Sequence, residues 1–221
     1  MKAITNNLKR ALDSLCQSAI TAGAEKVISF PASQVVIDER VRMKCLVPTC
    51  SFYGNSLLCP PNLISVEHFK NIVNLYEAAI LIRIPGSSTP VPSEVTNAAS
   101  LDDLWEKIYP AKRKQEESNP AVSYFNELKA SQERLYDILS VIESNSLKAG
   151  YRFSMGFAAG GCLLCDQCVG PNSNEPCRHP FRARPSMEAM GIDVVGTAEK
   201  VGVPVGFSSV QSHWFGLVLL E

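Results

Sequence analysis

Apolar residues recur at helical spacing in three segments of the chain. In residues 6–22 they lie three and four positions apart, and Gly23 follows where a helix would end. Residues 65–76 begin with Ser65, a residue type that caps helix N-termini, and predict a second helix. Residues 119–150 begin with Asn and Pro, which favour a helix start, and keep helical spacing throughout. We therefore predict three amphipathic helices.

Short runs of β-branched, aromatic and other apolar residues predict the strands. The predicted strands are residues 27–30, 35–37, 78–84, 151–157, 192–195 and 214–220. The run at 78–84 is apolar apart from Arg83, which is typical of a strand buried on both faces. Residues 186–190 predict a helical turn that ends at Gly191. Because helices and strands alternate, we expect an α/β or α+β fold with a central sheet flanked by helices.

Three segments interrupt this pattern. Residues 45–62, rich in Cys, Pro and Gly, and residues 162–177, which contain a second group of cysteines, are predicted loops. Both follow the ends of strands or helices, so we expect the two Cys-rich loops to converge on one side of the sheet. Residues 85–119 combine Pro, Ser and Thr with a run of mixed charge and predict a surface excursion.

The charge balance and the apolar runs exclude several classes of protein. The 221 residues carry 21 Lys and Arg against 22 Asp and Glu, without the basic excess typical of nucleic-acid binding. No apolar run approaches the roughly 18 residues that a membrane-spanning helix needs. Polar residues interrupt every apolar stretch near the N-terminus, so it lacks the apolar segment of a signal peptide. We expect a cytoplasmic protein that binds neither nucleic acid nor membrane.

Eight cysteines point to metal binding or redox chemistry, because disulfides are rare in a reducing cytoplasm. Four of them, Cys162, Cys165, Cys168 and Cys177, have the spacing C-x2-C-x2-C-x8-C. Three thiolates at two-residue spacing can hold three corners of a 4Fe-4S cluster, as in the loops of bacterial ferredoxins. Four thiolates also suit a structural zinc site, although zinc sites usually pair two separate C-x2-C motifs.

The first group of cysteines comprises Cys45, Cys50 and Cys59, with the spacing C-x4-C-x8-C. Three thiolates would leave one iron of a 4Fe-4S cluster open to a substrate, an arrangement that suits Lewis-acid chemistry. Alternatively, a fourth ligand comes from elsewhere in the chain, or both loops surround a single metal site. The candidates for a fourth ligand are Cys16, Cys177, His68, His179 and His213. Cys16 lies in a predicted helix and is expected to be a core residue.

Five further residues are candidates for contact with the cofactor. The guanidinium groups of Arg178, Arg182 and Arg184 would offset the negative charge of a thiolate-ligated cluster, or would instead bind an anionic substrate. His179, next to a predicted ligand, is expected to form a hydrogen bond near the cluster, with proton relay as the alternative. Tyr53 is expected to shape the first loop, with a catalytic role as the alternative.

The two cysteine patterns together resemble a family of predicted metal-binding proteins, domain of unknown function 2284. In the first half the resemblance rests on Cys45, Cys50, Tyr53, Gly54, Cys59, Pro60, Pro61 and Asn62. In the second half it rests on Gly161, Cys162, Cys165, Cys168, Cys177, Arg178, His179, Pro180, Arg184, Pro185, Ser186, Met187, Glu188, Ala189, Gly191, Ile192, Asp193 and Val194. It covers most of the chain except residues 85–119. The resemblance implies a cysteine-ligated metal centre of the iron-sulfur type, in anaerobic or archaeal settings, and no known reaction.

We therefore expect residues 1–221 to form a single cytoplasmic metal-binding domain that holds one or two 4Fe-4S clusters. The two competing functions are electron transfer to a redox partner protein and activation of a small-molecule ligand, as an iron-sulfur oxidoreductase or lyase. A second copy of the chain, in a homodimer, is a further candidate partner. The alternative from a different class is a zinc-stapled interaction domain without turnover.

Overall fold

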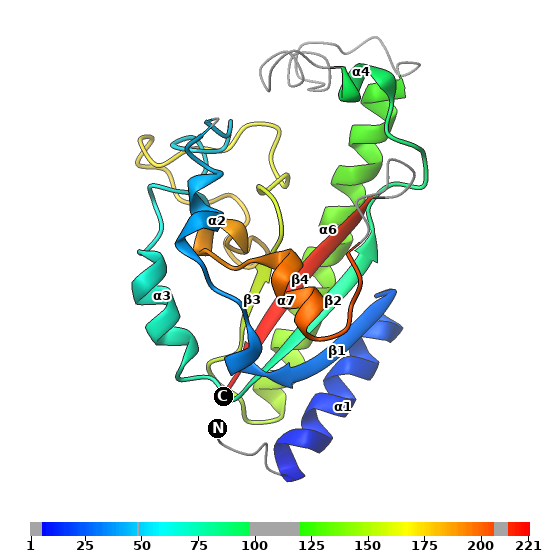
Figure 1. The fold of residues 1–221 in the computed structure, drawn as a ribbon, viewed down its shortest axis with the longest axis vertical. Coiled ribbons are helices and arrows are strands. Elements are labelled where there is room, and N and C mark those ends of the chain that lie inside the picture. Colours follow the sequence, from blue (N-terminus) through cyan, green and yellow to red (C-terminus); the bar gives the residue numbers. More distant parts are fainter. Residues whose placement is uncertain (1–5, 48, 98–119, 206–211) are drawn as a thin grey trace.

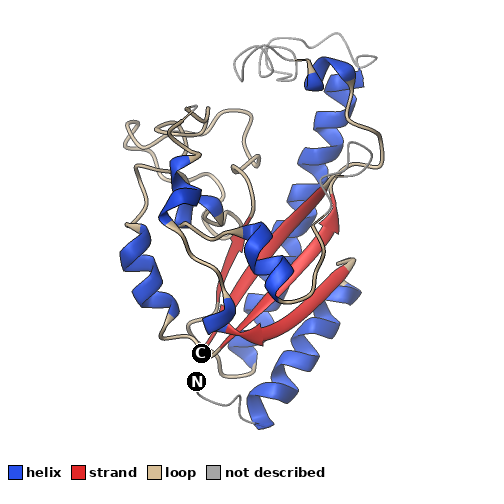
Figure 2. Ribbon diagram, viewed as in Figure 1, coloured by secondary structure: helices blue, strands red, loops and turns tan. Residues whose placement is uncertain are grey.

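An antiparallel sheet lies at the centre of the fold (Figure 2). The computed structural model describes residues 6–47, 49–97, 120–205 and 212–221. The strands in these residues are β1 (Lys26–Pro31), β2 (Ala78–Pro85), β3 (Met155–Ala158) and β4 (His213–Leu220). They lie in the order β1-β2-β4-β3, so that β1 and β3 form the two edges. Of the two expected fold classes, the antiparallel pairing selects α+β.

The two central strands are apolar on both faces. The register of β2 and β4 places Ile80 opposite Val218 on one face and Leu81 opposite Leu217 on the other. None of these four side chains is more than 1% exposed. Because alternate residues of a strand point to opposite faces, each face needs its own covering layer. The prediction that residues 78–84 form a strand buried on both faces is confirmed.

Two helices, α1 (Asn6–Thr21) and α6 (Pro120–Lys148), cover one face of the sheet (Figure 1). Leu12 of α1 and Leu139 and Ile142 of α6 are buried in the same cluster as Ile80 and Val218 of the sheet. Burial of one such side chain contributes roughly 1.5–3 kcal/mol. These contacts fix the position and rotation of α6, and therefore also the position of the polar residues on its flank.

The opposite face of the sheet is covered by shorter elements. They are α3 (Val66–Val73), the 3-10 helix η3 (Glu188–Met190) and α7 (Val194–Lys200). Phe69 of α3 meets Phe157 of β3 edge to face, with ring centroids 5.3 Å apart. Met187 and Ile192, on either side of η3, are buried in the same cluster. The segment that follows the second group of cysteines is therefore part of the core.

The remaining elements of the described residues are short. They are η1 (Ala32–Gln34), α2 (Glu39–Met43) and α4 (Ser93–Thr96). The hydrophobic pattern does not predict α2, which begins after Asp38 because the Asp38 carboxylate accepts a hydrogen bond from the Arg40 N–H. The helix α4 lies within the predicted surface excursion. The rest of that excursion, residues 98–119, lies outside the described residues.

Two predicted strands are wrong. Residues 35–37 follow η1 and contribute only an isolated bridge, between Ile37 and Ile192. Residues 192–195 lead into α7, because the Asp193 carboxylate accepts a hydrogen bond from the Gly196 N–H at 3.0 Å. A local capping bond at the helix start therefore outweighs the strand preference of the β-branched residues that follow.

The other predicted elements are confirmed with small shifts at their ends. The Ser65 hydroxyl caps α3 by accepting a hydrogen bond from the His68 N–H at 3.1 Å. The strand predicted at residues 151–157 begins only at Met155, after a turn in which Gly150 has a φ of 97°. Gly191, with a φ of 83°, ends η3 as expected. No helix within the described residues is long and apolar enough to cross a membrane.

Leu139→Ala is expected to lower the free energy of unfolding by about 2–5 kcal/mol, because Leu139 is 0% exposed where α6 meets the sheet. Urea unfolding of the purified protein measures this change. Leu147→Ala is the matched control, on the same helix but 61% exposed, and should change the free energy by no more than about 0.5 kcal/mol. Equal losses in both variants would show that α6 does not pack as described.

Candidate metal centre

Two cysteine loops lie at the same end of the fold (Figure 1). The first cysteine loop, residues 44–65, connects α2 to α3, and the second cysteine loop, residues 159–185, follows β3 and leads to η3. In their described residues, neither loop contains a helix or a strand. Their backbone N–H and C=O groups therefore need partners elsewhere: within the loops, between the loops or on neighbouring elements.

The two loops touch each other. The ring of Phe52, in the first loop, lies against Gly161 in the second, where an added Cβ atom would come within 2.5 Å of the ring. A side chain at position 161 would therefore push the loops apart. The N–H of Ser186, just past the second loop, donates a hydrogen bond to the carbonyl oxygen of Leu58 at 3.4 Å. These contacts join the first loop to both ends of the second.

Cys59 is a buried cysteine of the first loop, at 6% exposed. Burial raises the pKa of its thiol to about 12, and a hydrogen bond with Ser56 opposes that rise. The charges of Cys50, Cys45 and Cys162 raise the pKa further. Because charge interactions weaken with distance, these cysteines share one neighbourhood although Cys162 comes from the second loop. At neutral pH the Cys59 thiol keeps its proton until a metal ion displaces it.

Glu188, at the start of η3, lies close to both loops. Its Oε2 atom accepts hydrogen bonds from the Gly160 N–H at 2.9 Å and from the Ser186 hydroxyl at 3.0 Å. Burial raises the pKa of the Cys45 thiol, and the charges of Cys50 and Glu188 add to that rise. A carboxylate therefore stands beside the first group of cysteines and, at the same time, holds the backbone at the start of the second loop.

Cys162 is held by two residues of α6. The Gln132 side chain, 0% exposed, donates a hydrogen bond to the Gly161 carbonyl oxygen at 2.8 Å and accepts one from the Leu163 N–H at 2.9 Å. One helical turn further along α6, the Tyr136 hydroxyl donates a hydrogen bond to the Cys162 sulfur. Both peptide groups that flank Cys162 and the sulfur itself therefore bond to one helix.

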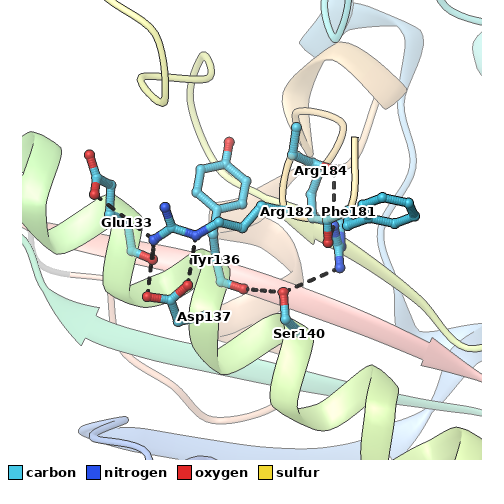
Figure 3. A network of polar contacts seen from close by, with 8 residues as sticks. Glu133, Tyr136, Asp137, Ser140, Phe181, Arg182 and Arg184 are labelled. Carbon is cyan, nitrogen blue, oxygen red and sulfur yellow. Dashed lines mark hydrogen bonds and ion pairs between the residues drawn. The ribbon is translucent and has the colours of Figure 1, made fainter. Parts of the chain in front are cut away.

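Two of the three predicted arginines bind carboxylates of α6. Arg182 donates two hydrogen bonds to Asp137, from Nε at 2.8 Å and from Nη2 at 3.0 Å (Figure 3). Arg184 donates from Nε to Glu143 at 2.8 Å, and its Nη2 contacts both the same carboxylate and the Ser140 hydroxyl. These ion pairs fasten the end of the second loop to α6. A role of Arg182 and Arg184 toward a cofactor stays a prediction.

A hollow of about 630 Å³ lies beside the second cysteine loop and is open to solvent. Its lining includes Cys165 and Cys168 together with two of the predicted cofactor-contact residues, Arg178 and His179. The Arg178 guanidinium donates a hydrogen bond to a backbone carbonyl of the loop at 2.8 Å. The backbone N–H of His179 donates to the sulfur of Cys177 at 3.4 Å. The structure thus brings two predicted ligands and two predicted contact residues to one hollow.

Tyr53 does not line this hollow. It lines a second hollow of about 410 Å³, together with Arg42 of α2 and with Ser65 and Val66 at the start of α3. The Arg42 guanidinium also donates to the Ile64 carbonyl oxygen at 2.7 Å, which ties α2 to the end of the first loop. Tyr53 therefore lines a different hollow from Arg178 and His179.

Three candidates for a fourth ligand of the first group have other surroundings. Cys16 forms a hydrogen bond with Ser29 of β1, and it lies on α1, which Figure 1 shows at the opposite end of the fold from the two loops. His68 is exposed on α3. The Nε2 atom of His213 is 3.4 Å from the carboxylate of Glu25. None of these contacts joins the candidate to either cysteine loop.

Within the described residues, no group of three His, Cys, Asp or Glu side chains is arranged to hold a metal ion as it stands. The chemistry of the donors nevertheless fits a soft metal. All eight cysteines are free thiols. Hydrogen-bond donors also reach two of the sulfurs, the His179 N–H at Cys177 and the Tyr136 hydroxyl at Cys162, as is usual around iron-sulfur clusters.

Cysteine spacing cannot reveal the contribution of α6 to this site. Among the described residues, seven residues of α6 form hydrogen bonds or ion pairs with the second cysteine loop, and we call them the loop-facing stripe. They are Lys129, Gln132, Glu133, Tyr136, Asp137, Ser140 and Glu143. These residues are polar or charged and lie three or four positions apart, so they share one face of the helix. The regular spacing of apolar residues, which predicts the helix itself, does not mark this polar face.

The chain matches the model of one protein family over residues 26–220, and that family is described as predicted metal-binding protein. No curated protein and no solved structure matches the chain. The matched segment includes both cysteine loops and the loop-facing stripe of α6. Because the match covers far more than half of the chain, the protein belongs to the DUF2284 family of predicted metal-binding proteins.

Proposed function

We propose that this protein is a cytoplasmic iron-sulfur protein whose two cysteine loops bind one or two 4Fe-4S clusters and activate a small polar ligand. The observation that carries the proposal is the presence of Cys165 and Cys168 in the lining of a hollow that is open to solvent. The proposed ligands are Cys45, Cys50, Cys59, Cys162, Cys165, Cys168 and Cys177. When bound, a cluster supplies electron transfer and a Lewis-acidic iron.

The arrangement of donors supports iron-sulfur over zinc. Cys162, Cys165 and Cys168 follow one another at two-residue spacing, which suits three corners of a cubane better than a tetrahedral zinc site. Donors to sulfur, such as the Tyr136 hydroxyl, are among the features that set the potential of such clusters. The thiols must come together on binding, and loops without helices or strands adapt more readily than regular elements.

The charges around the hollow support a small polar ligand. Its lining contains the basic residues Lys129, Arg178 and His179 and the acidic residues Asp166 and Glu175. Lys129 is already paired with Asp166, at 2.7 Å between Nζ and Oδ1. Arg178 is exposed, and its Nη1 atom donates to a backbone carbonyl, which leaves further guanidinium donors for a carboxylate.

Protein purified and reconstituted without oxygen is expected to be brown and to contain iron with matching acid-labile sulfide. Iron, sulfide and zinc analysis on the same sample measures this, with visible and EPR spectra to identify the cluster type. A colourless sample that holds stoichiometric zinc and unfolds on chelation would instead support the zinc-stapled domain, and would overturn the proposal.

Cys168→Ser and Cys59→Ser are each expected to remove most of the bound iron and sulfide, because a hydroxyl is a far poorer ligand for iron than a thiolate. Cys16→Ser is the matched control, since Cys16 lies on α1 and bonds Ser29 instead of a loop residue. It should keep the iron content of the unmodified protein. Circular dichroism of the metal-free variants checks that all of them fold. Equal iron loss in the control would contradict the assignment of ligands.

The cluster spectrum is expected to change when citrate or cyanide is added, because seven cysteines would leave one iron of two 4Fe-4S clusters without a cysteine ligand. Arg178→Gln should weaken citrate binding about tenfold, the loss expected for one charge-assisted hydrogen bond, and should leave cyanide binding unchanged. Titration followed by EPR measures both affinities. If no ligand changes the spectrum in any oxidation state, transfer of electrons to a redox partner is the better function.

A further inference from the structure

The environment of Gln132 is unusual for a buried polar side chain. It lies on α6, 0% exposed, and both ends of its amide are bonded to the second loop. The NH₂ group donates to the Gly161 carbonyl oxygen at 2.8 Å, and the carbonyl oxygen accepts from the Leu163 N–H at 2.9 Å. These two peptide groups lie on either side of Cys162. The donor and the acceptor of this one amide are therefore both paired with the backbone on the two sides of a single cysteine.

The same cysteine is restrained on its other sides. Leu163 is buried with Ala121 and Phe125 of α6, so the chain after Cys162 is anchored by apolar contacts as well. On the other side, Gly161 lies under the ring of the first-loop residue Phe52, which excludes any larger residue there. The backbone on both sides of Cys162 is therefore held by hydrogen bonds and apolar contacts from α6 and by Phe52 of the first loop.

Tyr136 adds a contact to the sulfur itself. Its side chain is 1% exposed and projects from α6 one turn after Gln132 (Figure 3). Cys162 packs against the buried cluster that contains the Tyr136 ring, and a hydrogen bond from the Tyr136 hydroxyl reaches the cysteine side chain. A hydrogen bond to a ligand sulfur stabilises the more negative, reduced state of a cluster and thereby raises its reduction potential.

We propose that Gln132 and Tyr136 are positioning residues of the metal centre, with distinct tasks. Gln132 fixes the backbone of Cys162, which keeps this ligand in place and slows metal release. Tyr136 donates to its sulfur, which raises the reduction potential of the bound cluster. This inference rests on the proposed function, because a potential can be measured only if the centre is redox-active. The effect of Gln132 on metal retention applies to any metal that the cysteines bind.

Gln132→Met tests the first task, because Met is similar in length to Gln but is apolar and cannot form hydrogen bonds with the two peptide groups. Transfer of metal to a chelator should become about 10- to 100-fold faster, as is typical when a residue supporting a ligand is lost. Ser146→Ala is the matched control. It removes another buried hydrogen bond of α6, to the Ile142 carbonyl oxygen, away from the loops, and should leave the release rate unchanged.

Tyr136→Phe tests the second task, because it removes a single hydroxyl and keeps the ring in the core. The reduction potential, measured by redox titration followed by EPR, should shift to a more negative value. Tyr124→Phe is the matched control, at a tyrosine of the same helix that is 6% exposed, and its potential should equal that of the unmodified protein. A purely structural role of Tyr136 would lower stability in urea without moving the potential.

The outcomes separate this inference from the proposed function. If the unmodified protein holds zinc and no cluster, the proposed function fails, and the chelator rates of Gln132→Met alone decide whether the clamp operates. If Gln132→Met does not fold, the potential of Tyr136→Phe decides. Release rates and potentials equal to those of the controls would overturn the inference even in a protein that carries iron and sulfide.

Discussion

The backbone of the second cysteine loop depends on α6, because a segment without helix or strand must satisfy its polar groups by other means. Gln132 bonds the peptide groups on both sides of Cys162, and Glu143 accepts a hydrogen bond from the Gly156 N–H at 2.7 Å, on the strand that enters the loop. The helix can do this because apolar residues on its other side are buried against the sheet. The sheet thus sets the position of α6, and α6 sets the shape of the loop.

Charge is balanced along this contact. Arg184 and Glu143 are only 13% and 19% exposed, so their ion pair is screened less by solvent than the more exposed pair of Arg182 with Asp137. Because these arginines are matched by carboxylates of α6, they add little net positive charge to the cysteine loops. Other donors near the cysteines do not bond a carboxylate in the described residues. They include the His179 N–H, which donates to the Cys177 sulfur, and the guanidinium group of Arg178, which donates to a backbone carbonyl. These groups can stabilise a negatively charged cluster.

Local pattern was a good guide wherever one physical signal acted alone. Residues 78–84 were predicted as a strand because all of them except Arg83 are apolar, and Ser65 was predicted as a cap because serine is a common residue type at helix N-termini. The prediction failed at residues 192–195, where β-branched residues favour a strand but Asp193 starts a helix. Two local signals competed there, and the capping bond prevailed. It also failed at residues 35–37, because a strand needs a partner and, within the described residues, this segment forms just the bridge between Ile37 and Ile192.

The sequence by itself determined the donors available for a metal, since the type and spacing of the seven loop cysteines are properties of the chain alone. It also determined the main helices and strands, because their signals lie within a few residues of one another. Only the tertiary structure decided which residues support those cysteines. Gln132 precedes the Gly161 carbonyl that it binds by 29 residues, and Phe52 lies in the other half of the chain. Such contacts depend on how the helix rotates on the sheet, and burial of apolar side chains along its whole length fixes that rotation.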